Sequence, residues 1–268
     1  MKKVFLHALS TAAMTLMLTF AISHQAQASG TPAEFEGLQA TVFGTPALIA
    51  ADTKIMIVTH GDSGKADYMV PFAEELAGEG IVAITLARPG CSIDGRKSKG
   101  KHDNRKGDLY TRSSMNRVAD AVKAIKEQYG TNHIFMTGHS GGAATVALVA
   151  ALNPDLLEGG IMVCLPADVV KWRHHAARRK GRKYHAWRNS LSPIKYVDDL
   201  APQARFVVIA GADDNNTPAE LAEEYVAKAT AEGKNIKLII VPGAGHRLNR
   251  DSDPKGQVIM DEATTLLQ

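Results

Sequence analysis

Six short apolar runs recur along the chain, and polar or glycine-rich turns and segments of helical spacing separate them. The runs cover residues 54–59, 81–86, 133–137, 160–165, 205–210 and 236–241. Between two of them, the segment from Ser113 to Tyr129 places Val118, Val122 and Ile125 on one helical face. Nearly continuous apolar strands that alternate with helices predict an α/β fold, with a mostly parallel central sheet and helices on both faces.

The region before the first buried run predicts a short hairpin. Residues 38–43 and 47–50 are two apolar segments on either side of Gly44-Thr45-Pro46, a turn signal. Residues 29–37 show no such pattern, so we expect them to form a loose lead-in.

The first 28 residues have the composition of a secretory signal peptide. Lys2 and Lys3 precede an apolar stretch over residues 4–22, and Ala26-Gln27-Ala28 supplies small residues for cleavage. We expect cleavage near Ala28, a mature domain over residues 29–268, and a periplasmic or secreted location in a bacterium. A retained anchor is the alternative, although polar residues dilute the apolar stretch and no later stretch is long enough to span a bilayer.

The 268 residues, 45% of them hydrophobic, suffice for one large domain with a packed core. Cys91 and Cys164 are the two cysteines of the chain, which excludes a disulfide scaffold. An exported protein could still form one disulfide. Both residues are expected near the ends of strands that are not neighbours, which favours two free thiols.

The pentapeptide Gly138-His139-Ser140-Gly141-Gly142 lies between an apolar run and a helical run of small residues. Strand, G-x-S-x-G and helix in this order are the setting of a nucleophile elbow. We expect the Ser140 hydroxyl to stand clear of the sheet. The N–H of Gly141, at the helix N-terminus, would point at the same space, and His139 would point away from it.

Candidate partners for Ser140 follow other predicted strands. The carboxyl ends of parallel strands share one crevice, where ligands bind in such sheets. His246 is the expected base, because it follows a late strand in a glycine-rich loop and lies downstream of an acidic strand end. Asp214 is the favoured acid, and Asp213 and Asp168 are the alternatives.

The order Ser140, Asp214, His246 resembles the nucleophile, acid and histidine order of the α/β-hydrolase superfamily. Over about residues 38–268 the matching motifs are the elbow, His60-Gly61, Gly211 to Pro218, and Gly243-Ala244-Gly245-His246. Residues 192–197 also resemble prolyl-oligopeptidase-type catalytic domains and their small esterase relatives.

The resemblance implies an α/β-hydrolase fold, and the short region before the first buried strand suggests a trimmed sheet. It also implies an oxyanion hole in which the backbone N–H of Asp62 acts beside that of Gly141.

Residues 167–192 form a basic insertion, a segment that is usually a lid over the active site in the resembling fold. No carboxylate occurs between Asp168 and Asp198. The cations there are Lys171, Arg173, Arg178, Arg179, Lys180, Arg182, Lys183 and Arg188, and the aromatic residues are Trp172, Tyr184 and Trp187. The insertion is either a positive funnel for an anionic substrate or a docking site for an anionic envelope surface. The alternative is a solvated helix whose aromatic residues pack on the core.

These features predict an exported serine hydrolase that cleaves a carboxylic ester through an acyl-enzyme. No metal or organic cofactor is needed, and we expect the cations around His174, His175 and His185 to repel a metal ion. One alternative is a serine peptidase acting on short peptides. Another is a catalytically silent envelope-binding protein. No motif in the sequence indicates a nucleic-acid partner.

Overall fold

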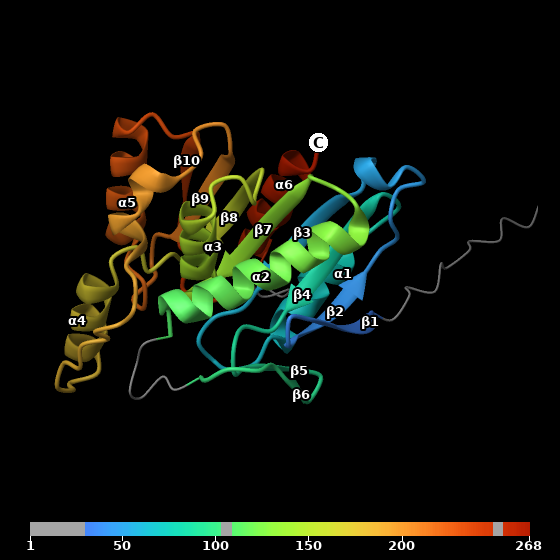
Figure 1. Ribbon diagram of the computed structural model, residues 1–268. Coiled ribbons are helices and arrows are strands. Elements are labelled where there is room, and N and C mark those ends of the chain that lie inside the picture. The colour runs from blue at the N-terminus through green and yellow to red at the C-terminus, as the bar shows by residue number, and fades with distance from the viewer. Residues whose placement is uncertain (1–29, 103–108, 249–253) are drawn as a thin grey trace, which may run out of the picture.

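The computed structural model describes residues 30–102, 109–248 and 254–268. Within them, eight strands form one sheet in the order β1-β2-β4-β3-β7-β8-β9-β10 (Figure 1). The strands are β1 (Thr31–Phe35), β2 (Leu38–Phe43), β3 (Lys54–Thr59), β4 (Ile81–Leu86), β7 (Ile134–His139), β8 (Gly159–Val163), β9 (Arg205–Gly211) and β10 (Ile236–Val241). The β1–β2 and β2–β4 pairs are antiparallel, and the other five pairs are parallel. The apolar runs therefore predicted the parallel part of the sheet.

Helices cover both faces of this sheet (Figure 1). They are α1 (Val70–Leu76), α2 (Arg112–Tyr129), α3 (Gly141–Leu152), α4 (Val169–Arg179), α5 (Ala219–Ala231) and α6 (Gln257–Leu266). Buried residues of α2, α3 and α5 form one core cluster with one face of the strands. Residues of α1 and α6 form a second cluster with the other face. In the part of the chain that the structure describes, no helix is long and apolar enough to cross a membrane.

The helices differ in burial according to their sequence pattern. α3 carries no charged residue and is buried through eleven of its twelve positions, because it packs between the sheet and neighbouring helices. α2 is amphipathic and buries only one stripe. Its ends are defined by the Thr111 side chain, which accepts the N–H of Ser114, and by Gly130 in the left-handed conformation (φ 63°).

The predicted hairpin of residues 38–43 and 47–50 is wrong. β2 instead pairs with β1, which lies in the supposed lead-in, and residues 50–52 form a short 3-10 helix. The connecting residues Glu36 (φ 48°) and Gly37 (φ 79°) both have positive φ, as tight hairpin turns of this twist require. The sheet is consequently not trimmed, because β1 and β2 extend it past β4.

The two cysteines follow strands that are separated in the sheet. Cys91 comes after β4 and Cys164 directly after β8, and β3 and β7 lie between those strands. Both residues are buried and free, as expected. The loop that contains Cys91 also carries a two-stranded ribbon of β5 (Ser92–Ile93) and β6 (Arg96–Lys97). The predicted signal peptide, residues 1–28, lies outside the described residues.

Candidate active site

Ser140 lies on a sharp turn between β7 and α3. Its backbone has φ 55° and ψ −115°, a strained conformation for a residue with a side chain. The N–H of Ser140 donates to the carbonyl of Val163 in β8 (2.8 Å), which ties the turn to the neighbouring strand. This is the geometry that the G-x-S-x-G motif predicts.

Asp214 and His246 come together from loops 32 residues apart in the chain. His246 Nδ1 lies 2.8 Å from Asp214 Oδ2, and the Asp214 side chain is fully buried. Burial opposes the charge of Asp214. Hydrogen bonds from His246 and from the N–H groups of Thr217 and Asn216 outweigh burial and lower the pKa of Asp214. The ionised carboxylate therefore fixes His246 with Nδ1 as donor and Nε2 as acceptor.

The other two acidic candidates lie elsewhere. Asp213 is exposed, and its N–H donates to the carbonyl of Ala244. Asp168 begins α4, where its carboxylate accepts the N–H groups of Val170 and Lys171. The structure brings only Asp214, among the three, into contact with His246.

Ser140 and His246 line the same cavity, but Asn216 lies against His246 Nε2, the nitrogen that does not face Asp214. The Asn216 amide Nδ2 lies 2.9 Å from His246 Nε2 and donates to it. Among the described residues, the Ser140 hydroxyl makes no hydrogen bond. Proton transfer from Ser140 to His246 would therefore require the Asn216 amide to turn away.

The loop that follows β3 carries Asp62, and a buried cluster holds its carboxylate. Arg88 Nη2 donates to Asp62 Oδ1 (2.6 Å), and the Tyr110 hydroxyl donates to Oδ2 (2.7 Å). A Cβ atom at Gly141 would collide with this carboxylate, so Asp62 lies directly over the start of α3. Among the described residues, the N–H groups of Asp62 and Gly141 donate to no acceptor.

The Asp62 cluster is charged and buried. Burial disfavours ionisation of Arg88, but the carboxylate of Asp62 outweighs it and raises the pKa of Arg88. Burial, together with the same carboxylate, raises the pKa of Tyr110 well above its usual range. Arg88 therefore stays a cation and Tyr110 a neutral donor, and together they satisfy both oxygens of Asp62.

His139 connects the loops on either side of Ser140. The N–H of Gly61 donates to the Tyr68 hydroxyl (2.5 Å), which lies 3.1 Å from His139 Nδ1. His139 Nε2 lies 2.8 Å from the carbonyl oxygen of His246, and the two rings lie 4.9 Å apart. The expectation that the His139 side chain points away from the reacting side holds for the cavity, because His139 does not line it. The His139 ring nevertheless lies beside His246, the expected base.

One group of side chains in the described residues has the spacing of metal ligands. The ligand atoms of His139, Cys164 and His246 lie within 4.8 Å of one another. Hydrogen bonds to Asp214 and to the His246 carbonyl already occupy His246 Nδ1 and His139 Nε2. Burial raises the pKa of Cys164 well above its usual range, so this thiol is a poor metal ligand.

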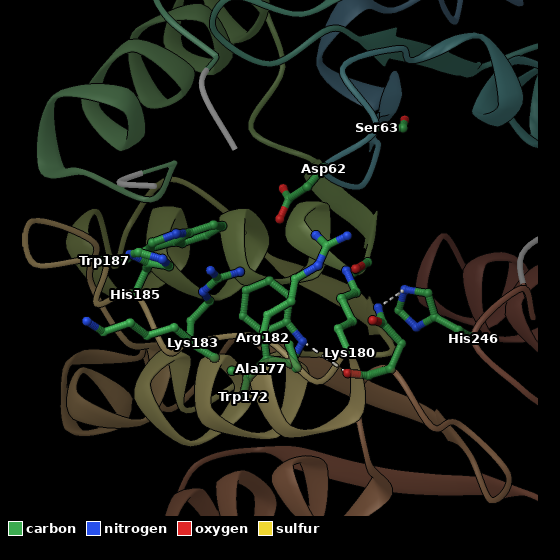
Figure 2. Close-up of a pocket in the computed structure, with 14 residues that line it drawn as sticks. Asp62, Ser63, Trp172, Ala177, Lys180, Arg182, Lys183, His185, Trp187 and His246 are labelled. Carbon is green, nitrogen blue, oxygen red and sulfur yellow. Dashed lines mark hydrogen bonds between the residues drawn. The ribbon is translucent and has the colours of Figure 1, made fainter. Parts of the chain in front are cut away.

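The basic insertion covers the cavity. Trp172 and Trp187 are buried in the core, as the solvated-helix alternative expects, whereas several cations of the same segment line the cavity. In the view of Figure 2, Asp62 lies above the cavity, with Trp187 at one end and His246 at the other. Lys180 and Arg182 lie between those ends (Figure 2). The basic insertion therefore packs two indole rings into the core and presents several cations to the cavity.

Sequence reasoning missed several residues that shape this site: Tyr68, Arg88, Tyr110 and Asn216. Arg88 could have been found, because it follows a predicted strand and so lies at the carboxyl edge of the sheet. Asn216 lies two residues after the favoured acid, but nothing in its position predicts contact with His246. Tyr68 and Tyr110 lie in segments without a motif.

The model of the prolyl oligopeptidase family matches residues 73–263. The chain belongs to this family. The matched range includes Ser140, Asp214 and His246. The protein is a serine hydrolase of α/β-hydrolase fold, and both esterases and peptidases occur among its structural neighbours.

Three solved structures illustrate the fold of this family member. Proline iminopeptidase from Mycobacterium smegmatis shares 18% sequence identity at a TM-score of 0.65, over 89% of this chain and 99% of that one. An esterase from Pyrococcus furiosus shares 14% at a TM-score of 0.67, over 89% and 91%. Acylaminoacyl peptidase from Pyrococcus horikoshii shares 13% at a TM-score of 0.69, over 89% of this chain but 41% of that one.

Proposed function

We propose that the protein is an exported carboxylesterase in which Ser140 is the nucleophile, His246 the base and Asp214 the acid that orients it. The observation that carries this proposal is that Ser140 and His246 line one cavity, while buried Asp214 binds His246 Nδ1. A serine on a strained turn, with a histidine held in one tautomer, is the arrangement that nucleophilic catalysis requires.

The reaction proceeds in two steps. His246 Nε2 takes the proton of the Ser140 hydroxyl as Oγ attacks the ester carbonyl, and the N–H groups of Gly141 and Asp62 stabilise the oxyanion. The bond to the alcohol breaks, and His246 returns the proton to the departing oxygen. Water then attacks the acyl-enzyme, with His246 again as base, and releases the carboxylic acid and free Ser140.

The charges around the cavity favour an ester over the substrate of an aminopeptidase. An enzyme that recognises a free α-ammonium group needs an anionic side chain to bind it. Asp62 is the carboxylate of this cavity, and Arg88 and Tyr110 already occupy both its oxygens. A serine peptidase acting on short peptides is the second candidate, because a cationic wall suits a peptide's terminal carboxylate.

Export is part of the same proposal. The basic start, apolar middle and small-residue end of residues 1–28 support a cleaved signal peptide and a periplasmic or secreted location. The exposed cations of the basic insertion support attachment to an anionic envelope surface as an alternative role. Salt-sensitive binding of a Ser140→Ala protein to anionic vesicles would favour that role.

The decisive experiment treats the chain from Ser29 onward with a fluorophosphonate probe and measures intact mass. We expect one adduct on the wild type and none on Ser140→Ala. Ser63→Ala is the matched control, because Ser63 is another serine of the cavity wall and should leave the adduct in place. If the folded wild type forms no adduct, the hydrolase mechanism is wrong and the binding role becomes the leading one.

A further inference from the structure

The cavity beside Ser140 has a strongly positive wall. It encloses about 840 Å³ and is lined by Arg173, Lys180, Arg182 and Lys183 from the basic insertion. Asp62 is the carboxylate of the lining, and Arg88 already neutralises it at 2.6 Å. Within the described part of the chain, these four cations form no ion pair with a carboxylate.

Arg173 is the least exposed of these cations. Its guanidinium carbon lies 4.5 Å from the ring centre of Trp187 and 5.7 Å from that of Trp172. Stacking on two buried indoles fixes the plane of the guanidinium group and leaves its edge for ligands. Its Nε is buried and has no hydrogen-bond partner among the described residues.

Trp187 supplies a second unpaired donor in the same wall. Only 6% of this residue is exposed, and its indole Nε1 is buried without a partner in the described part of the chain. Buried donors are nearly always hydrogen bonded in folded proteins. Both residues line the cavity, but the two donor atoms themselves are covered, so a small shift of the side chains would bring them to acceptors of a bound ligand.

The cations also repel one another. Burial, followed by nearby Arg179, Arg182 and Arg173, lowers the pKa of Lys180. An anion in the cavity would relieve this repulsion, and a cation would increase it. The wall is thus built for negative charge near the reacting serine.

We propose that this cavity selects esters or peptides that carry an oxyanion, either a carboxylate or a phosphate, and that Arg173 and the Trp187 N–H bind it. The inference rests on the proposed hydrolase function, since it assigns the substrate class of the same site. Arg173 acts as the specificity-determining residue, because its planar fork can bind two oxygens of one oxyanion. Lys180, Arg182 and Lys183 supply the surrounding positive potential.

The kinetic test compares p-nitrophenyl hydrogen adipate, which carries a carboxylate, with the neutral p-nitrophenyl methyl adipate, because the longer chain prevents the carboxylate from attacking its own ester. Leaving group and chain length are matched, so the ratio of their kcat/KM values reports charge recognition. The wild type should favour the anionic ester by about tenfold to a hundredfold, the range of a hydrogen-bonded charge. Arg173→Met should lose this preference, and Arg173→Lys should keep part of it.

Arg178→Met is the matched control. Arg178 belongs to the same helix, α4, but it lines a separate groove between α4 and α5. It removes one positive charge without touching the cavity, so the preference for the anionic ester should persist. Circular dichroism and labelling by the fluorophosphonate probe would show that Arg173→Met is folded with a reactive Ser140.

A binding measurement on Ser140→Ala separates anion recognition from turnover. Calorimetry with glutarate and with phenyl phosphate would show whether the site prefers a carboxylate or a phosphate. Arg173→Met in the same background should weaken binding of the preferred anion at least about tenfold.

A wild type with equal kcat/KM for both esters, whose Ser140→Ala variant binds neither anion, would overturn the inference and leave the hydrolase function intact. Absence of a probe adduct together with Arg173-dependent anion binding would overturn the hydrolase function and retain the anion site.

Discussion

At the scale of single residues, His139 is a neutral group enclosed between two loops that flank Ser140. Burial, followed by the electrostatic effect of the neighbouring His246 ring, lowers the pKa of His139 to about 4. Its Nε2 donates to the carbonyl of His246, and its Nδ1 accepts from Tyr68. Protonation would break the second of these bonds and place a charge in the core.

This depressed pKa predicts a loss of stability in acid. An unfolded histidine takes up a proton below about pH 6.5, whereas folded His139 does so only near pH 4. His139 therefore contributes to stability above about pH 6.5, and this contribution is lost as the pH falls toward 4. The full effect is about 3 kcal/mol.

Chemical denaturation of wild type and His139→Gln at pH 7 and pH 4 tests this prediction. The variant should be less stable at pH 7, because it loses native packing, but its free energy of unfolding should fall less between the two pH values. Equal pH dependence in both proteins would contradict the assigned burial of a neutral imidazole.

The Asp214 and Asp213 pair offers a second test at this scale. Asp214 is 4% exposed and binds His246, whereas Asp213 is exposed and makes no contact with it. Asp214→Asn should lower kcat by at least about a hundredfold, because the amide can favour the wrong tautomer of His246. Asp213→Asn should stay within about twofold of wild type. The reverse ranking would reassign the acid.

At the scale of elements, α4 is fastened to the loop that follows β9. Trp172 Nε1 donates to the carbonyl of Asn216 (3.0 Å), and His175 Nε2 to that of Asn215 (2.8 Å). Arg179 Nη2 donates to the Asn216 side chain at 2.7 Å. The same amide donates to His246 Nε2, so the position of α4 is coupled to His246, the proposed base.

This coupling predicts that loosening Asn216 exposes His246 Nε2. Arg179→Met and Asn216→Ala should each raise the rate of fluorophosphonate labelling of Ser140 by about twofold to tenfold. Either change weakens or removes the hydrogen bond from Asn216 to His246 Nε2, so that this nitrogen is free to accept the Ser140 proton. Arg178, one residue away on α4, makes no hydrogen bond to Asn216, so Arg178→Met should label at the wild-type rate. Slower labelling of Asn216→Ala would instead mean that this amide supports the reactive arrangement.

At the scale of the whole molecule, the central sheet separates the two thiols. β3 and β7 lie between the strands that precede Cys91 and Cys164. Burial raises the pKa of Cys91 to about 11, and it raises that of Cys164 well above its usual range. Both thiols are therefore protonated and inaccessible in the folded protein.

We expect Cys91 and Cys164 to be completely protected from alkylation in the folded protein. Native protein treated with iodoacetamide at pH 8 should gain no mass, and protein unfolded in guanidinium chloride without reductant should gain two carbamidomethyl groups. A protein that gains none when unfolded would contain a disulfide, and the separation of the two strands would be wrong.

Much of the fold could be predicted because apolar periodicity reports burial directly. The six parallel strands and α2 lie where their patterns place them, within one or two residues, although β10, at the sheet edge, is only partly buried. The β1–β2 hairpin could not be predicted in this way. Thr31–Phe35 contains a proline and a charged residue, and it pairs with β2 only at the edge of the sheet. There, pairing depends on the partner strand and on the turn at Glu36-Gly37, which no short-range pattern showed.

The sequence by itself determined the α/β class, the elbow at Ser140 and the candidates for its partners, since each depends on local pattern and on the shared carboxyl edge of parallel strands. Only the tertiary structure decided which acid contacts His246. Asp213 and Asp214 are neighbours in the sequence, and they differ in the direction in which their side chains point. The tertiary structure also decided that Asn216 caps His246 and that Asp62 pairs with Arg88. These contacts join segments far apart in the chain, and their geometry follows from packing that local pattern does not record.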